Sequence, residues 1–285
     1  MSGIGVARQV LRRSLRQRAG FSDVLRAMTT KGTAVPLARL ALLLVLSACA
    51  SSPSGPSQDG PAPPGALRVL FIGNSLTYYN DLPGVVAALV DSLDLAQPFW
   101  YRTAAVPDYS LEDHWLTTSS RTALERDSFD IVVMQQGPSS LPENQAHLRE
   151  WAVRWATAIR EAGAVPAMYM VWPDATRRFA FEDVAEAYTA AAVAIDGMLF
   201  PVGRAWLEAW SIESGLALYG PDAFHPSGLG TYLAALVMLD RLYTVDLATV
   251  PARIRTSGGV TITVPAEMQA ALIQATRTAN EQYAR

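Results

Sequence analysis

Short apolar runs alternate with longer helical segments from residue 67 onward, and this alternation constrains the fold more than any other feature. The apolar runs predict five strands, at residues 67–72, 99–104, 131–134, 165–172 and 198–202. The segments between and after them predict helices at residues 85–93, 143–161, 180–195, 203–213 and 229–242. Strands that alternate with helices in this way form parallel sheets with helices on both faces. We therefore predict an α/β fold of three layers, α/β/α, around about five parallel strands.

The C-terminal end departs from this rhythm. Residues 254–263 hold two short β-branched runs around Gly258-Gly259, which predicts a hairpin. Residues 265–283 predict a final helix whose apolar face carries Met268, Leu272, Ala275 and Ala279. The chain has 285 residues, half of them apolar, which is ample for a sizeable core. We predict a folded domain over residues 67–285, with the hairpin and the helix as its last elements.

The first 48 residues have the organisation of a secretory signal. Several arginines precede a short apolar run, Leu40 to Leu46, which is too short to span a bilayer as a permanent helix. The quartet Leu46-Ser47-Ala48-Cys49 is similar to a bacterial lipobox, in which the cysteine is lipidated and becomes the mature N-terminus. Cys49 is the only cysteine of the chain and falls where that chemistry requires it, which favours this interpretation over a chance thiol. The long arm before the run makes Met28 an alternative start.

The segment after Cys49 connects this signal to the domain. Residues 49–66 are rich in Pro, Gly and Ser, a composition typical of an extended tether. We therefore predict an exported protein of the bacterial cell envelope, held at the membrane by a lipid on Cys49 and facing the periplasm. Residues 1–48 hold 8 of the 23 basic and 1 of the 26 acidic residues, so the remainder has a net charge of about −10. Such a chain repels phosphate backbones, and we predict no nucleic-acid partner.

Two loops place the groups of acyl transfer at one edge of the predicted sheet. The first strand ends in Gly73-Asn74-Ser75-Leu76, so a serine follows a buried strand. Far downstream, Asp222 precedes His225 by three residues, in a loop just before an apolar helix. An aspartate at this spacing can accept the Nδ1–H of the imidazole and leave Nε2 as a base. A helix cap at Ser75 and a polar turn at Asp222–Pro226 are the alternatives, but the complementary roles favour a catalytic site.

These two segments resemble the first and last blocks of the SGNH (GDSL-like) hydrolases, lipases and esterases of flavodoxin-like α/β/α fold. The first block reads Gly73-Asn74-Ser75-Leu76, with Asn74 where the family often has Asp. The last block, Asp-x-x-His-Pro-Ser, is matched from Asp222 to Ser227. The resemblance covers about residues 67–242. It implies that Ser75 is the nucleophile, His225 the general base and acid, and Asp222 the residue that orients His225.

The two middle blocks of the family are not matched. The second supplies a glycine N–H to the oxyanion, but residues 104–111 contain no glycine and include Pro107, which has no N–H. The third, Gly-x-Asn-Asp, falls on residues 135–140, Gln-Gln-Gly-Pro-Ser-Ser, with Ser139 in place of the asparagine donor. Because an oxyanion needs only a well-placed donor, we predict that the Ser75 N–H acts with Gln136 or Ser139. Gln136 is preferred because it precedes the Gly137 turn, and residues 107–110 are the fallback.

Other polar residues near these blocks have weaker signals. Asn74 lies beside the nucleophile and is assigned to the substrate site. His114 follows the second block and either lines the substrate pocket or packs as a helix-face histidine beside the core residue Trp115. The histidine and acidic residues lack metal-ligand spacing, so we predict no metal and no cofactor.

The predicted function is a serine esterase that hydrolyses carboxylic esters through an acyl-enzyme. Acetyl groups on carbohydrates are candidate substrates, because an envelope enzyme meets them, and a small-molecule ester is also possible. Two alternatives remain open. One is a non-catalytic carbohydrate-binding module on the same fold, in which the unmatched middle blocks reflect lost activity. The other is an acyltransferase with the same three residues, in a site that excludes water.

Overall fold

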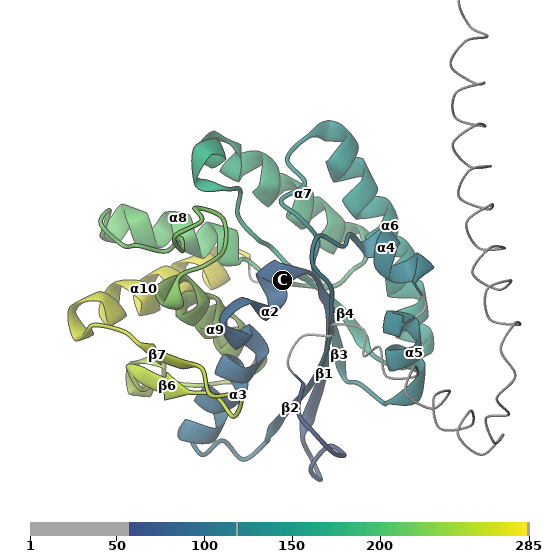
Figure 1. Ribbon diagram of the computed structural model, residues 1–285, viewed down its shortest axis with the longest axis horizontal. Helices are drawn as coiled ribbons and strands as arrows, with labels where there is room; N and C mark the ends of the chain where they lie inside the picture. The colour runs from purple at the N-terminus through teal and green to yellow at the C-terminus, as the bar shows by residue number, and fades with distance from the viewer. Residues whose placement is uncertain (1–56, 118, 284–285) are drawn as a thin grey trace, which may run out of the picture. The chain divides into compact units, whose positions relative to one another are not determined.

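The computed structural model describes residues 57–117 and 119–283 (Figure 1). The predicted signal segment, the lipidation site Cys49 and residues 50–56 of the predicted tether lie outside this range. Within it, no helix is both long enough and apolar enough to cross a membrane.

A parallel sheet of five strands forms the centre of the domain. In chain order the strands are β1 (Leu67–Gly73), β2 (Phe99–Ala105), β3 (Ile131–Met134), β4 (Val165–Tyr169) and β5 (Met198–Phe200). Their order in the sheet is β2-β1-β3-β4-β5, and every neighbouring pair is parallel. All five predicted strands are thus confirmed. The fourth ends at Tyr169 rather than at residue 172 because β5 spans only three residues and pairs no further.

The strand order places a switch point between β1 and β3. The chain runs from β1 out to β2 and then returns past β1 to form β3. In open α/β sheets of this kind, ligands bind beyond the carboxyl ends of the strands at such a point. The loops that leave β1 and β3 at this edge contain Asn74-Ser75 and Gln135-Gln136.

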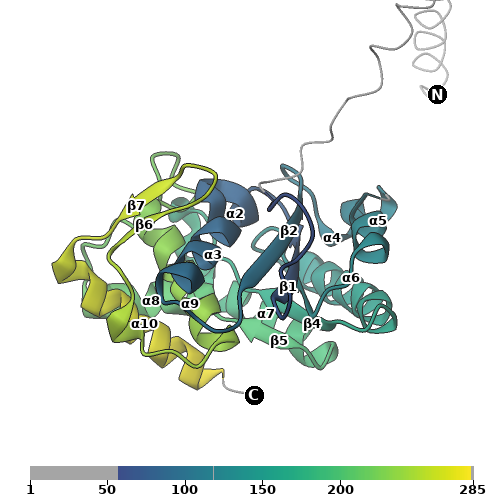
Figure 2. The same ribbon diagram turned by 90° about the horizontal axis from the view of Figure 1, so that it is seen from below.

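Helices cover both faces of the sheet (Figures 1 and 2). One face carries α3 (Leu82–Ser92), α8 (Val202–Ile212) and α9 (Gly228–Leu242), and the other carries α4 (Leu111–Leu116), α5 (Ser119–Arg126), α6 (Pro142–Glu161) and α7 (Phe181–Ala194). The three-layer α/β/α prediction is confirmed. Helix α9 is buried over most of its length, as its apolar sequence predicts. Helices α4 and α5 are short and were not predicted.

The C-terminal hairpin packs against α3 and α9, and the final helix packs against α8 and α9. Strands β6 (Arg253–Arg255) and β7 (Thr261–Thr263) form an antiparallel hairpin, and Gly259 in its turn has a φ of +89°, which glycine adopts without strain. Helix α10 (Ala266–Gln282) follows and lies against α8 and α9 (Figure 2). The predicted hairpin and final helix are both present.

The described end of the predicted tether lies along the edge strand β2. The Gln58 N–H donates to the Tyr101 carbonyl at 3.3 Å, and the Thr103 N–H donates to Ser57 Oγ at 2.9 Å. These contacts cover part of an edge whose backbone groups would otherwise be open to another strand.

Candidate active site

Ser75 lies at the carboxyl end of β1, at the first position of the short helix α2 (Ser75–Tyr78). Asn74 caps this helix, because its Oδ1 accepts the Leu76 N–H at 3.2 Å. The Nδ2 of Asn74 donates to the Tyr109 carbonyl at 3.1 Å and so ties the loop after β1 to the loop after β2. The side chain of Asn74 therefore shapes the nucleophile loop by its own hydrogen bonds.

A buried glutamine from the next strand holds the same loop. Gln135 Oε1 accepts the Asn74 N–H at 2.9 Å and the Thr77 hydroxyl at 2.7 Å. Its Nε2 donates to Asn74 Oδ1 at 2.9 Å. A Cβ atom at Gly73 would lie 2.5 Å from Gln135 Oε1 and 2.3 Å from Thr77 Oγ1, so only glycine fits there. The Gly-Asn-Ser segment is thus fixed by a glutamine whose role sequence reasoning missed.

His114 is fully buried, and its ring does not line the cleft around Ser75. Burial lowers the pKa of His114, which favours the neutral imidazole. Nε2 lies 2.7 Å from the Gly73 carbonyl, which can only accept, so Nε2 carries the hydrogen and Nδ1 accepts from the Ser120 hydroxyl at 2.7 Å. This corrects the prediction of a pocket residue: His114 supports the nucleophile loop from behind.

Asp222 and His225 form a hydrogen-bonded pair in the loop before α9. Asp222 Oδ2 lies 2.5 Å from His225 Nδ1, and Asp222 Oδ1 accepts the backbone N–H of His225 at 2.9 Å. The bond from His225, with help from neighbouring backbone N–H groups, lowers the pKa of Asp222 to about 2. The carboxylate therefore stays ionised at neutral pH and holds the hydrogen on Nδ1, which leaves Nε2 as the acceptor. The predicted spacing brings these two side chains together.

The second ring nitrogen of His225, Nε2, is shielded from solvent but makes no hydrogen bond. It has no partner among the described residues, Ser75 included. The loop that carries it is fixed from the β4 side, where Trp172 Nε1 donates to the Phe224 carbonyl at 3.0 Å and the Ala175 N–H donates to the Ala223 carbonyl at 2.8 Å. A base in this state can accept a proton from a hydroxyl that reaches it.

A cleft of about 540 Å³ opens at this edge of the sheet. Its walls come from the loops after β1, β2 and β3 and from the first turns of α6, with Arg177 from the segment after β4 and Phe224 from the loop of the Asp222–His225 pair. Ser75 lines it together with Gln136 and Ser139. The cleft therefore brings the predicted nucleophile and both predicted side-chain donors to one cavity.

Gln136 and Ser139 are linked to each other. Gln136 Nε2 donates to Ser139 Oγ at 3.0 Å, and Gln136 Oε1 accepts the Leu111 N–H at 3.2 Å. An amide nitrogen carries two hydrogens, so one remains for a ligand. Strand alternation separates the two glutamines as expected: Gln135 turns toward the nucleophile loop, while Gln136 faces the cleft.

Asp108 also lines the cleft, in the loop after β2. Its φ of 62° is in the left-handed region, which favours glycine and which aspartate tolerates better than most residues. Among the hydrogen bonds of the described residues, none uses the Asp108 N–H. Asp108 therefore has left-handed backbone angles and an N–H without a hydrogen-bond partner, as a glycine donor at this position would. The Pro107-Asp108 pair, typical of a turn, was the sequence signal for it.

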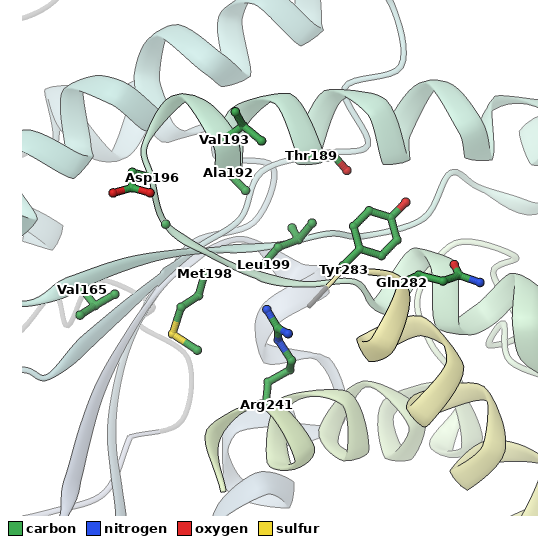
Figure 3. A pocket seen from close by; sticks show the side chains of 11 residues that line it. Val165, Thr189, Ala192, Val193, Asp196, Met198, Leu199, Arg241, Gln282 and Tyr283 are labelled. Atoms are coloured by element: carbon green, nitrogen blue, oxygen red, sulfur yellow. The ribbon is translucent and has the colours of Figure 1, made fainter. Parts of the chain in front are cut away.

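A second cavity, of about 430 Å³, lies at the opposite edge of the sheet (Figure 3). Arg241 reaches into it from the end of α9, toward Met198 and Leu199 at the start of β5. Its lining includes no serine, cysteine or histidine, so it lacks the acyl-transfer groups of the cleft. Neither in these cavities nor elsewhere do the described residues contain a cluster of three or more His, Cys, Asp or Glu side chains that could hold a metal ion.

Solved structures with the same architecture show which fold this chain has. A candidate SGNH hydrolase from Slackia heliotrinireducens is 27% identical, with a TM-score of 0.52 over 62% of this chain and 100% of its own. The chain has the SGNH hydrolase fold. A DUF4886 family protein from Bacteroides uniformis ATCC 8492 is 18% identical, with a TM-score of 0.60 over 76% of this chain and 95% of its own. An acetyl xylan esterase is 11% identical, with a TM-score of 0.52 over 62% of this chain and 100% of its own.

The resemblance carried by the first and last sequence blocks is thus confirmed. The Slackia relative also supports the predicted class, an SGNH-type hydrolase. No family model and no curated protein matches this sequence.

Proposed function

We propose that this SGNH-type protein is a serine esterase that removes small acyl groups, acetyl above all, from carbohydrate esters. The observation that carries the proposal is the ionised Asp222 on His225 Nδ1, in a loop whose Phe224 lines the same cleft as Ser75. Nucleophile, base and orienting carboxylate are the three groups that acyl transfer to a serine needs.

The reaction proceeds in two halves. The Ser75 hydroxyl attacks the ester carbonyl as its proton passes to His225 Nε2, and Asp222 stabilises the imidazolium that forms. The tetrahedral intermediate then expels the alcohol, which takes the proton from His225, and an acyl-Ser75 remains. Water attacks this ester with His225 as base, and collapse releases the carboxylic acid and returns the proton to Ser75. Contacts between base and nucleophile are often long in the free enzyme and tighten only when substrate binds.

The oxyanion is stabilised by three donors around the cleft. The Ser75 N–H lies at the start of α2, and Gln136 Nε2 has one hydrogen free of Ser139. The Asp108 N–H takes the place of the missing glycine donor. Donors fixed in advance cost no reorganisation when charge develops, which is why they lower the barrier.

The cleft favours a polar alcohol. Its lining includes acidic, amide, hydroxyl and basic side chains, and two aromatic rings: Asp108, Ser110, Glu143, Asn144, His147 and Arg177, with Tyr109 and Phe224. Many hydrogen-bonding groups beside aromatic rings suit a sugar better than a long acyl chain. The acetyl xylan esterase of the same fold gives a precedent for such a substrate.

Acetate release from acetylated xylan by the full-length protein tests the proposal, with p-nitrophenyl esters of two, four and eight carbons run in parallel. We expect turnover of the acetyl substrates and a steep fall with chain length. Ser75→Ala should lower kcat by about 10⁴–10⁶ with an unchanged melting temperature. Ser128→Ala, outside the cleft, is the matched control. Sugar binding without turnover would indicate a binding module, and acyl release only with an added alcohol would indicate a transferase.

We also propose that the enzyme is exported and anchored in the envelope through a lipid on Cys49. The lipobox-like quartet and the Pro/Gly/Ser-rich segment support this location. Cys49→Ser should move the protein from the membrane fraction to the soluble fraction. A wild-type protein that is fully soluble and carries no acyl mass on Cys49 would contradict the proposal.

A further inference from the structure

The segment between the nucleophile helix α2 and helix α3 has an unusual backbone. It is a single 3₁₀ turn, Tyr79–Asp81, and two consecutive residues in it are left-handed: Asn80 with a φ of 53° and Asp81 with a φ of 57°. Residues other than glycine adopt this conformation rarely, and such departures gather at functional sites. With this backbone, the side chains of Tyr79 and Asn80 both contact the loop that carries His225.

Tyr79 lies flat against the imidazole of His225. The two ring centroids are 4.3 Å apart and the planes are 15° from parallel. Phe224 meets the same imidazole at 5.2 Å and 69°, which is an edge contact. Asp222 holds the ring at Nδ1. The imidazole is thus held by a face contact on one side and a hydrogen bond at one edge, and Nε2 stays free.

Asn80 fixes the loop that carries His225. Its Nδ2 donates to the Pro226 carbonyl at 2.9 Å and to Thr231 Oγ1 at 3.0 Å. These bonds reach the residue directly after His225 and the first turn of α9. The segment that follows Ser75 by four residues therefore connects the nucleophile helix to the loop of the base.

We propose that Tyr79 is a positioning residue for His225, which fixes the plane of the imidazole and stabilises its protonated form. This inference rests on the proposed esterase function. An aromatic face attracts a cation, and the imidazolium exists only once the proton has left Ser75. An interaction that strengthens in the transition state raises kcat rather than substrate affinity. The Tyr79 hydroxyl makes no hydrogen bond within the described residues, so the ring alone carries the effect.

Two substitutions at Tyr79 separate the ring from the hydroxyl. With p-nitrophenyl acetate and the full-length protein, Tyr79→Phe should keep kcat within about twofold. Tyr79→Leu should lower kcat by roughly 5- to 30-fold with KM nearly unchanged. Tyr283→Leu makes the same change at the opposite edge of the sheet and should leave kcat unaltered. Equal kcat in wild type and Tyr79→Leu, or an equal loss in both Tyr79 variants, would overturn the proposal.

A serine-reactive fluorophosphonate gives a readout that needs no ester. Ser75 Oγ forms a bond to phosphorus, fluoride leaves, and His225 takes the hydroxyl proton, so the labelling rate reports how well His225 serves as base. We expect wild type and Tyr79→Phe to label alike and Tyr79→Leu to label several-fold more slowly. Labelling without ester turnover would contradict the esterase proposal alone, whereas an unlabelled wild type would contradict both.

Two further measurements test the contact between Tyr79 and His225 if Tyr79→Leu folds poorly. Asn80→Gly suits the left-handed backbone but loses the bonds to Pro226 and Thr231, and it should also slow labelling. In NMR spectra, the ring protons of His225 should be shifted upfield by Tyr79 in the wild type and in Tyr79→Phe. Unshifted His225 protons in the wild type would show that the stack does not exist in solution.

Discussion

The first and last loops of the site differ from the two middle loops in what they contribute. Ser75 and the Asp222–His225 pair have proposed roles as nucleophile, base and orienting carboxylate, which only a few residue types can fill. The loops after β2 and β3 contribute N–H groups and hydrogen bonds, through Asp108, Gln135 and Gln136. A reaction that needs a specific side chain leaves a specific sequence pattern, whereas a donor can come from any backbone or amide. The outer blocks therefore match the family's pattern and the middle blocks do not.

The two kinds of loop are nevertheless one structure. Gln135 of the third block holds the backbone of Asn74, and Asn74 in turn holds the loop of the second block at Tyr109. His114, which follows the second block, supports the carbonyl of Gly73. The unmatched loops hold the loop of Ser75 in place, in addition to their proposed part in the oxyanion hole. Substitutions in the two regions should therefore affect different properties, activity or stability, and by different amounts.

After the loss of Ser75 itself, the largest effect is expected at Asp222, in the last of the outer loops. Asp222→Asn removes the charge that stabilises the imidazolium and can donate to Nδ1, which selects the wrong tautomer of His225. We expect kcat to fall by about 10³–10⁴, as for other triads that lose this carboxylate. Asp183→Asn, on the exposed surface of α7, is the control.

The same variant has a pH signature. The pKa of Asp222 is lowered to about 2, so the stabilisation from its bond to His225 is present above the ordinary pKa near 4 and is lost as the pH falls toward 2. Melting temperatures of wild type and Asp222→Asn should therefore converge between pH 4 and pH 2. Parallel curves over that range would contradict the assignment of the pair.

A smaller loss of kcat is expected in the middle loops. Gln136→Met keeps the length of the side chain but removes its N–H donor, and we expect kcat to fall by about 10²–10³ with little change in KM. Asp108→Gly keeps the backbone N–H and suits the left-handed φ, so it should remain near wild type. If Gln136→Met and Ser139→Ala both keep wild-type kcat, the donor lies in the loop of residues 107–110.

The third effect is a loss of stability, expected at Gln135. This residue of the middle loops holds the loop of Ser75 through its bond to Asn74. Gln135→Leu fills a similar volume but leaves the Asn74 N–H and the Thr77 hydroxyl without a partner in the core. An unsatisfied buried polar group costs about 1–3 kcal/mol, so we expect the free energy of unfolding to fall by about 2–3 kcal/mol in urea titrations. Gln274→Leu, exposed on α10, should change it by less than about 0.5 kcal/mol. Equal stabilities would show that the nucleophile loop does not depend on Gln135.

The same contrast explains how much the sequence could predict. Buried parallel strands form continuous apolar runs, so all five were found, whereas α4 and α5 have few buried residues. The Ser110-x-x-Asp113 capping box was the readable signal for α4. Asp222 and His225 lie three residues apart and meet by local geometry. The contacts of Gln135 with Asn74, and of Tyr79 with His225, join segments far apart in the chain, and only the fold brings them together.

The smallest effect is expected at Asp81, which lies outside the first and last loops and outside the two middle loops. This carboxylate is almost fully buried at the start of α3, where its Oδ1 accepts the Gly84 N–H at 3.2 Å, while its Oδ2 has no hydrogen-bond partner among the described residues. Burial raises the pKa of Asp81 above its ordinary value. For a carboxyl group with a raised pKa, protonation favours the folded state, and that stabilisation is lost as the pH rises through the raised value.

Asp81→Asn should therefore be more stable than wild type at pH 7, and the difference should shrink as the pH falls toward 4. Asparagine keeps an acceptor for Gly84 and tolerates the left-handed backbone, so the charge is the main change. Urea unfolding at pH 4.5 and pH 7 measures the effect. If the variant is instead less stable at pH 7, the hydrogen bonds to the ionised carboxylate outweigh its desolvation. Asp81 would then resemble Asp222, a carboxylate whose ionised form is stabilised by its hydrogen-bond partners.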